Sequence, residues 1–274
     1  MPAINTNTAA NAAVRYLNIN SAQESSSLSK LSSGSRITSA SDDAAGLAIS
    51  TRISSDVTTL QQAATNASQA TAILQTADGG ASNISDILAR MKSLASESSS
   101  GTTTNSSRSY IQSEFSQLKS EIDSIATGTR YSGQSLLDGS SVFSSGVSVL
   151  VGSSGSDTIT IQLSSLTSSS LGVGSLDISS QTGATSALST LDSAIDTVSG
   201  ARANIGAQES RFNFSSDSIS TQTQNLQSAN SAIKDVDIAS EQAKLSSAEV
   251  KTQAAVSAES AANQMPQYLL KLLS

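Results

Sequence analysis

The sequence contains no cysteine, no histidine and no tryptophan. Without histidine the chain lacks the usual general base of hydrolytic enzymes and the commonest metal ligand, and without cysteine it can form neither disulfides nor thiolate metal sites. The many serines therefore have no histidine partner that would activate one of them as a nucleophile. We expect no enzyme activity and no catalytic, cofactor-binding or metal site.

Basic residues and long apolar runs are also scarce. The chain has 15 Lys and Arg against 22 Asp and Glu, and its pI is near 4.5, whereas nucleic-acid-binding proteins neutralise phosphates with clustered basic side chains. No apolar stretch is long enough to cross a bilayer, and the first residues lack the basic and apolar regions of a secretory signal. These absences predict no nucleic-acid partner, no membrane partner and, for an exported protein, a route other than the general secretory one.

Apolar residues make up 37% of the 274 residues and aromatic residues 3%, which is little for a compact core. What the chain does contain is a line of apolar side chains that recur every seven residues, typical of a helix that packs along a partner. A single helix over 188–233 would be about 70 Å long. The second set of seam positions in this repeat, three or four residues from the apolar line, is polar from Arg202 and Glu209 onward, so the apolar stripe is narrow. The residues of the line are Leu191, Val198, Ile205, Phe212, Ile219, Leu226 and Ile233.

Two further stretches have the apolar spacing of helices. From 41 to about 98 two apolar lines run side by side, which indicates contact with two partner helices, and 111–125 carries one clean stripe. Ser41, Asp42 and Asp43 predict the start of the longer helix, because carboxylates in a first turn complement the helix dipole. The sequence therefore predicts a bundle of long helices.

The middle of the chain has a different pattern. Within 142–165, Val and Ile alternate with small polar residues on both sides of a Gly- and Ser-rich turn, which predicts a β-hairpin. The stretch 164–186 is dominated by Ser, Thr and Gly, and we expect it to be a surface connector into the long helix. No further domain fits between the hairpin and that helix.

Both ends of the chain carry thin apolar stripes. A helix with so thin a stripe is marginal on its own and depends on packing against other helices, so we expect the two ends to pair with each other. Gly34 supplies the backbone freedom of the turn that ends the first segment. The best seams are Val14, Leu17, Ser21, Glu24, Leu28 and Leu31 at one end, and Val250, Ala254, Ala258, Ala261, Met265, Leu269 and Leu272 at the other.

Several short segments of the sequence resemble the terminal regions of bacterial flagellins. The similar segments cover roughly residues 1–140 and 186–274. At the N-terminal side they are Ile4-Asn5-Thr6-Asn7, Leu31-Ser32-Ser33-Gly34-Ser35-Arg36-Ile37, Ser41-Asp42-Asp43-Ala44-Ala45-Gly46-Leu47-Ala48-Ile49 and Gln75-Thr76-Ala77-Asp78-Gly79. At the C-terminal side they are Arg202-Ala203-Asn204-Ile205-Gly206-Ala207-Gln208-Glu209-Ser210-Arg211-Phe212 and Ala262-Asn263-Gln264-Met265-Pro266-Gln267.

The resemblance implies a mainly α fold, with a long antiparallel helical coiled-coil rod, a small β-hairpin and paired N- and C-terminal helices. Residues 1–40 and 236–274 would form a terminal coiled-coil domain that lines an inner tube. Residues 41–235 would form a helical rod domain with the β-hairpin around 142–165. No outer variable domain is expected, because the chain is short between the hairpin and the last long helices.

In function, the resemblance implies a secreted, extracellular structural subunit that polymerises into the bacterial flagellar filament, the helical propeller of swimming motility. It would be exported unfolded by the flagellar type III apparatus and fold on assembly. The implied partners are other copies of the chain or other flagellins in a mixed filament, an export chaperone, the filament cap, the hook-filament junction proteins and a host innate immune receptor. The alternatives are a hook-filament junction protein of the same superfamily and a surface adhesin, which would need an aromatic-lined concave site.

The candidate functional residues follow from these stripes and segments. In flagellins the positions of Arg90, Leu94 and Glu114 belong to a patch that the innate immune receptor recognises, and the alternative interpretation is rod surface or subunit contact. Asp42 and Asp43 are adjacent, so on a helix they would point about 100° apart and would not form a metal or acid/base pair. The subunit-interface candidates are Val14, Leu17, Leu28, Leu31, Arg36, Asp42, Asp43, Val250, Ala254, Ala261, Met265, Leu269 and Leu272.

Overall fold

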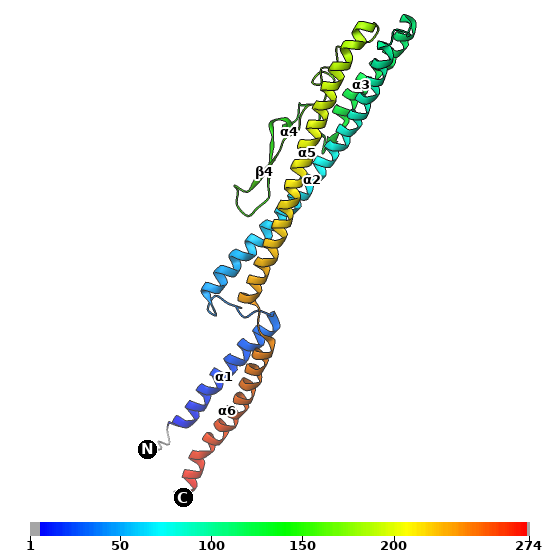
Figure 1. Cartoon of the computed structure of the whole chain (residues 1–274). Helices are drawn as coiled ribbons and strands as arrows, with labels where there is room; N and C mark the ends of the chain where they lie inside the picture. The colour runs from blue at the N-terminus through cyan, green and yellow to red at the C-terminus, as the bar shows by residue number, and fades with distance from the viewer. Residues whose placement is uncertain (1–5, 273–274) are drawn as a thin grey trace. The chain divides into compact units, whose positions relative to one another are not determined.

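The computed structural model describes residues 6–272, and side chains up to residue 265. The fold is mainly α, as predicted, with two small antiparallel strand pairs (Figure 1). The helices are α1 (Thr8–Ser33), α2 (Ala44–Ser99), α3 (Asn105–Gly128), α4 (Val142–Ser145), α5 (Gln181–Lys234) and α6 (Ile238–Leu272). The strands are β1 (Arg130–Tyr131), β2 (Gln134–Ser135), β3 (Val147–Leu150) and β4 (Thr158–Ile161).

The chain divides into two compact units. The terminal unit comprises residues 1–55 and 225–274, and the rod unit comprises residues 56–224. Helices α2 and α5 contribute residues to both units. The assignment of 1–40 and 236–274 to an inner tube, and of 41–235 to a rod domain, stays a prediction.

In the rod unit, α2, α3 and α5 pack around one hydrophobic core. The three-four spacing of apolar residues puts large side chains on the facing surfaces of these helices, where they are fully removed from water. The seven-residue line of α5 is buried from Leu191 to Ile219 and half-buried at Leu226 and Ile233. Side chains from the three helices that are fully buried include Leu74, Leu88, Phe115, Ile122, Leu191 and Phe212.

The predicted hairpin is formed by β3 and β4, which pair Val147 with Ile161 and Leu150 with Thr158. Its residue Ile161 is buried in the rod core. A second, shorter hairpin of β1 and β2 was not predicted, since strands of two residues carry no alternation that a sequence pattern could show. Its turn contains Ser132 and Gly133, both with positive φ.

The stretch 164–186 leads into the long helix α5, as predicted, but it is not confined to the surface, and that part of the prediction was wrong. Its few apolar side chains are buried in the rod core, and α5 begins at Gln181 within it. Asp123 on α3 fixes the stretch by accepting 2.8 Å hydrogen bonds from both the amide and the hydroxyl of Ser168. The buried apolar residues of this stretch are few and irregularly spaced among Ser and Gly, so no periodic pattern in the sequence indicates them. These residues are Leu166, Leu171, Val173 and Ile178.

In the terminal unit, α1 and α6 lie side by side along a seam with alternating three- and four-residue steps (Figure 1). The predicted seam of α1 was wrong at Val14, Ser21 and Leu28, which are exposed. The alanine stripe predicted for α6 is likewise exposed where its side chains are described, up to Met265. The observed seam comprises Ala10, Ala13, Leu17, Asn20, Glu24, Ser27 and Leu31 of α1 and Glu241, Leu245, Ala248, Thr252, Ala255, Glu259 and Ala262 of α6.

Candidate functional site

The seam between α1 and α6 contains a buried polar contact. Ser27 is fully buried and Glu241 is 5% exposed. The Lys244 ammonium donates a 2.9 Å hydrogen bond to Oε2 of Glu241, and the Ser27 hydroxyl donates a 2.8 Å hydrogen bond to Oε1. These two bonds, that of Lys244 first, lower the pKa of Glu241 and keep its carboxylate charged. A buried polar pair of this kind adds little stability but disfavours other registers of the two helices.

Two further side-chain bonds cross the seam and show that the helices are antiparallel. The Asn7 amide donates to the carbonyl oxygen of Ala262 at 2.8 Å, and the Thr252 hydroxyl donates to Glu24 at 3.3 Å. Alanine is the commonest residue of the seam and removes little apolar area from water when it is buried, and Leu17, Leu31 and Leu245 are the large apolar side chains of the seam. The coiled coil of a single chain is therefore weakly held together.

Large apolar side chains of the terminal unit lie outside this seam. Val250 is 65% exposed and Met265 is 60% exposed. Exposed apolar groups that recur along both helices of a pair indicate a further contact surface. The other exposed members of this set, in α1 and α6, are Val14, Tyr16, Ile19, Leu28, Ile238 and Val256.

The predicted interface residues of α1 and α6 fall into three groups. Leu17 and Leu31 are half-buried in the seam within the chain. The side chains of Leu269 and Leu272 lie outside the described residues. The remaining candidates are exposed and free to meet another molecule, and their role stays a prediction; they are Val14, Leu28, Val250, Ala254, Ala261 and Met265.

Arg36 stabilises the end of α5. Its backbone amide donates to the carbonyl oxygen of Lys234 at 2.6 Å, and its guanidinium donates to that of Ile233 at 2.7 and 3.2 Å. A cation on the last carbonyls of a helix satisfies groups that have no partner within the helix and complements its dipole. The guanidinium also lies 3.7 Å from the carboxylate of Asp43. Arg36 therefore links the segment after α1 to both long helices.

Asp42 and Asp43 precede α2 and are not in its first turn, which corrects the prediction. The helix begins at Ala44, and Asp43 caps it by accepting a 2.8 Å hydrogen bond from the amide of Gly46. Asp42 accepts bonds from the hydroxyl and amide of Thr38 and from the amide of Ser39, which lower its pKa to about 2. Both carboxylates therefore have roles within the chain, and a role between subunits stays a prediction.

The predicted receptor patch lies on α2 and α3 of the rod unit. Arg90 and Glu114 form a 2.6 Å ion pair in which both side chains are about half exposed. Leu94, in contrast, is 2% exposed and belongs to the rod core. Arg90 and Glu114 are thus accessible to a partner, whereas the side chain of Leu94 lies in the core. Recognition by an immune receptor stays a prediction.

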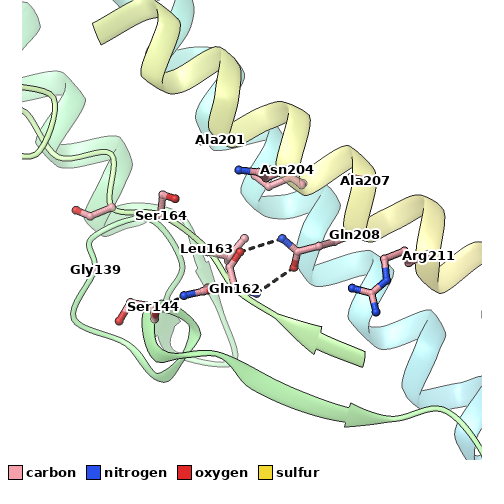
Figure 2. Close-up of a pocket in the computed structure, with 12 residues that line it drawn as sticks. Gly139, Ser144, Gln162, Leu163, Ser164, Ala201, Asn204, Ala207, Gln208 and Arg211 are labelled. Carbon is pink, nitrogen blue, oxygen red and sulfur yellow. Dashed lines mark hydrogen bonds between the residues drawn. The ribbon is translucent and has the colours of Figure 1, made fainter. Parts of the chain in front are cut away.

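The rod unit also has a cavity of about 740 Å³ between α5 and the loops around the hairpin (Figure 2). Gln208 of α5 fixes one side, because its amide group donates to the carbonyl of Gln162 and accepts from the amide of the same residue, both at 3.0 Å. Arg211 and Asn204 also line the cavity. None of the described residues that line it is aromatic, so it does not match the concave site that the adhesin alternative requires.

A polar cluster that the sequence did not reveal lies between α2 and α5. Arg202 donates to both carboxylate oxygens of Asp78, at 2.8 and 3.2 Å. Glu209, two turns further along α5, has a buried carboxylate oxygen for which the described residues provide no hydrogen-bond partner. Burial, and then the charge of Asp78, raise its pKa. The sequence showed that these positions are polar, but not that they face an acidic residue of another helix.

The described residues contain neither a membrane-spanning helix nor a cluster of metal ligands. No helix within 6–272 is both long enough and apolar enough to span a membrane. No group of three or more Asp and Glu residues in the same part of the chain is arranged to hold a metal ion.

Comparison with known proteins identifies similarity along nearly the whole chain. The family description "bacterial flagellin N-terminal helical region" matches residues 4–142, and "bacterial flagellin C-terminal helical region" matches residues 188–273. The flagellar filament 30.7 kDa core protein of Treponema maltophilum is 34% identical over 99% of each chain. A flagellin of Halalkalibacterium halodurans is 35% identical over 98% of this chain and 99% of its own.

Solved structures support the same likeness. The crystal structure of Bacillus cereus flagellin is 29% identical and covers 61% of this chain and 94% of its own, with a TM-score of 0.52. A putative flagellar hook-associated protein from Vibrio parahaemolyticus has a TM-score of 0.60, covering 71% of this chain and 100% of its own. At 15% identity the latter likeness shows a shared fold alone.

Proposed function

This chain belongs to the bacterial flagellin family, and we propose that its terminal helices α1 and α6 fold only as they meet neighbouring copies in the filament. The protein is a structural subunit of the flagellar filament, and the family is a structural one. In the proposed mechanism, residues 1–40 and 236–274 line the inner tube, and 41–235 form a prefolded rod.

The observation that supports this mechanism is the seam of the terminal unit. Burial of apolar surface contributes about 25 cal/mol per Å², whereas ordering a residue costs roughly 1–2 kcal/mol. A seam of alanine and polar residues with only three leucines does not offset that cost within one chain. The exposed Val250 and Met265 supply the missing apolar area when other copies cover them, so that folding and assembly are coupled.

The same weakness suits export. A chain whose ends are unfolded before assembly can enter the flagellar type III apparatus in an extended form and fold outside the cell. An export chaperone would cover the exposed apolar residues of α6 before passage, and the filament cap and hook-filament junction proteins would receive the chain afterwards. Mixed filaments with other flagellins use the same surfaces.

Brief proteolysis tests the mechanism. Protease should remove both ends of the free subunit and leave a helical fragment near 40–235 that cannot polymerise, whereas seeded filaments should resist cleavage. Hydrogen exchange gives the matching measurement, with fast exchange in α1 and α6 of the free subunit and slow exchange around Leu191 and Leu226. Equal protection of the ends and of α5 in the free subunit would exclude folding on assembly.

A further inference from the structure

We propose that the two sides of the terminal coiled coil are complementary, so that a basic groove on one side receives an acidic, apolar edge from a second copy of the chain. The proposal rests on the proposed function and specifies which surfaces meet. The lysine groove is lined by Ile19, Gln23, Ala243, Lys244, Ala248 and Lys251, among others. The acidic edge consists of Val14, Leu28, Glu249 and Val256.

The lysine groove lies on one side of the seam. It has a volume of about 590 Å³ and runs between α1 and α6. Ile19, Ala243 and Ala248 give it an apolar floor, and Lys244 and Lys251 stand seven residues apart, about 10 Å along the helix. Ile19 is 51% exposed although it is a large aliphatic side chain. The groove therefore offers apolar contact beside Lys251 and Lys244, and because the Lys244 ammonium is paired with Glu241, Lys251 is the charge available to a partner.

The acidic edge lies on the opposite side of the same seam. In an antiparallel coiled coil, the residues directly before the seam positions Leu245 and Thr252 lie on one side of the helix pair. The residues directly after the seam positions Ala248 and Ala255 of α6, and directly after Ala13 and Ser27 of α1, lie on the opposite side. Lys244 and Lys251 precede seam residues, whereas Glu249 and Val256 follow them, as do Val14 and Leu28 in α1. The four residues of the edge are exposed. The edge thus combines apolar side chains with one negative charge.

A helical filament needs two different surfaces for each contact. Copies related by a screw operation meet through unlike faces, because a face that paired with itself would close the assembly into a dimer. The lysine groove and the acidic edge are unlike in shape and opposite in charge, and each copy carries one of each. One contact therefore leaves the groove of one copy and the edge of the other free to continue the polymer.

The spacing of the two surfaces sets a register. The Ser27 to Glu241 bond places Leu28 close to the level of residue 240 on α6, about nine residues from Glu249. When α6 of a second copy runs parallel and its Glu249 stands beside Lys251, its Leu28 comes to the level of residue 242, adjacent in sequence to Ala243 of the apolar floor. One arrangement thus satisfies both the charged and the apolar contact.

Charge reversal tests the pairing. Lys251→Glu and Glu249→Lys should each raise the critical concentration for seeded polymerisation about fivefold at low salt, the equivalent of roughly 1 kcal/mol lost in one contact per subunit. The double variant Lys251→Glu, Glu249→Lys should return to within about twofold of the wild type, because each contact regains opposite charges. Residues two apart on one helix do not face each other, so the rescue would report contact between copies.

The controls separate the possible failures. Ser154→Glu adds a charge on the exposed hairpin turn and should leave the critical concentration unchanged. Circular dichroism of the free subunits should be the same for all variants, since both charged residues are exposed. Single variants that polymerise like the wild type, or a double variant that is worse than either single one, would overturn the pairing. A wild-type protein that fails to polymerise on seeds would instead overturn the proposed function.

Discussion

The rod unit and the terminal unit use the same helical geometry but bury different side chains. In the rod unit, α2 and α5 bury Leu74, Leu88 and Phe212 completely, and α3 adds Phe115 and Ile122. In the terminal unit, the corresponding positions of α1 and α6 hold mostly Ala, Ser, Asn and Glu. The geometry of a seam therefore does not reveal how much stability it provides; the area of apolar surface that it buries does.

The difference separates stability within a chain from stability between chains. The rod unit covers most of its large apolar residues with its own helices, although Tyr110, Val142 and Phe214 are exposed. The terminal unit leaves Val250, Val256 and Met265 exposed and closes its seam with small residues. This difference is what the proposed mechanism requires, in which the rod is folded in the free subunit and neighbouring copies cover the apolar side chains of α1 and α6.

Two side-chain truncations, one in each unit, should give the largest difference in the free energy of unfolding. Phe212→Ala should lower the free energy of unfolding of the free subunit by about 3–5 kcal/mol, because a fully buried aromatic ring leaves a cavity. Leu17→Ala in the terminal seam should change the same quantity by less than about 0.5 kcal/mol, because in the proposed mechanism that seam forms only on assembly. Urea denaturation followed by circular dichroism measures both.

The critical concentration for assembly, unlike the free energy of unfolding of the free subunit, should respond to Leu17→Ala. Leu17→Ala should raise the critical concentration for seeded polymerisation, although it leaves the free subunit unchanged. A Leu17→Ala variant that destabilises the free subunit as much as Phe212→Ala does would show that the terminal unit is already folded before assembly.

The closeness of packing in the rod unit gives a second, smaller effect. A Cβ atom on Gly80 of α2 would clash with Oγ1 of Thr129 and would lie 2.9 Å from Cδ1 of Leu137, whereas one on Gly79 would meet nothing within 4 Å. Gly80→Ala should therefore destabilise the rod unit by about 1–3 kcal/mol through overpacking. Gly79→Ala should stabilise it by about 0.5–1 kcal/mol through helix propensity.

The two glycines are adjacent in sequence, so each serves as the control of the other in thermal denaturation. Equal shifts of the midpoint for Gly79→Ala and Gly80→Ala would mean that the contact with Thr129 and Leu137 relaxes without cost.

The sequence predicted the rod unit well because its signal is periodic and apolar. The line from Leu191 to Ile233 and the stripe of α3 were visible as spacing alone, and the structure buries or half-buries all of their members. The terminal seam was predicted less well, because apolarity was the guide. The true seam runs through Ser27 and Glu241, which no apolar pattern can reveal, and larger side chains such as Val250 lie outside it.

Other features escaped prediction for different physical reasons. Leu171 and Ile178 anchor a stretch without regular secondary structure, so they have no period to detect. The capping role of Asp43 depends on where the first helical residue falls, and helix ends are defined by single hydrogen bonds. The electrostatic effect of Asp78 on Glu209 depends on two helices meeting at a particular level.

The response to acid gives the smallest and most specific contrast between the two units. In the terminal unit, Lys244 and Ser27 hold the pKa of Glu241 below its ordinary value of 4.5. The folded state therefore gains stability from this carboxylate above pH 4.5 and loses it as the pH falls through the lowered pKa. Between pH 7 and acid, wild-type filaments should therefore lose more stability than Glu241→Gln filaments do. Depolymerisation is measured as a function of pH, and the stability of each filament is compared with its own value at pH 7.

In the rod unit the sign is opposite. Burial and the charge of Asp78 raise the pKa of Glu209 above 4.5, so its ionised form opposes folding at neutral pH. As the pH falls from 7 into the interval between the raised pKa and 4.5, the folded state binds a proton that the unfolded state does not, and the rod unit becomes more stable. Glu209→Gln should stabilise the free subunit at pH 7 and abolish this gain. Urea denaturation between pH 7 and 4.5 measures it, and a wild-type rod whose stability falls over that interval as fast as that of Glu209→Gln would show that Glu209 ionises without cost.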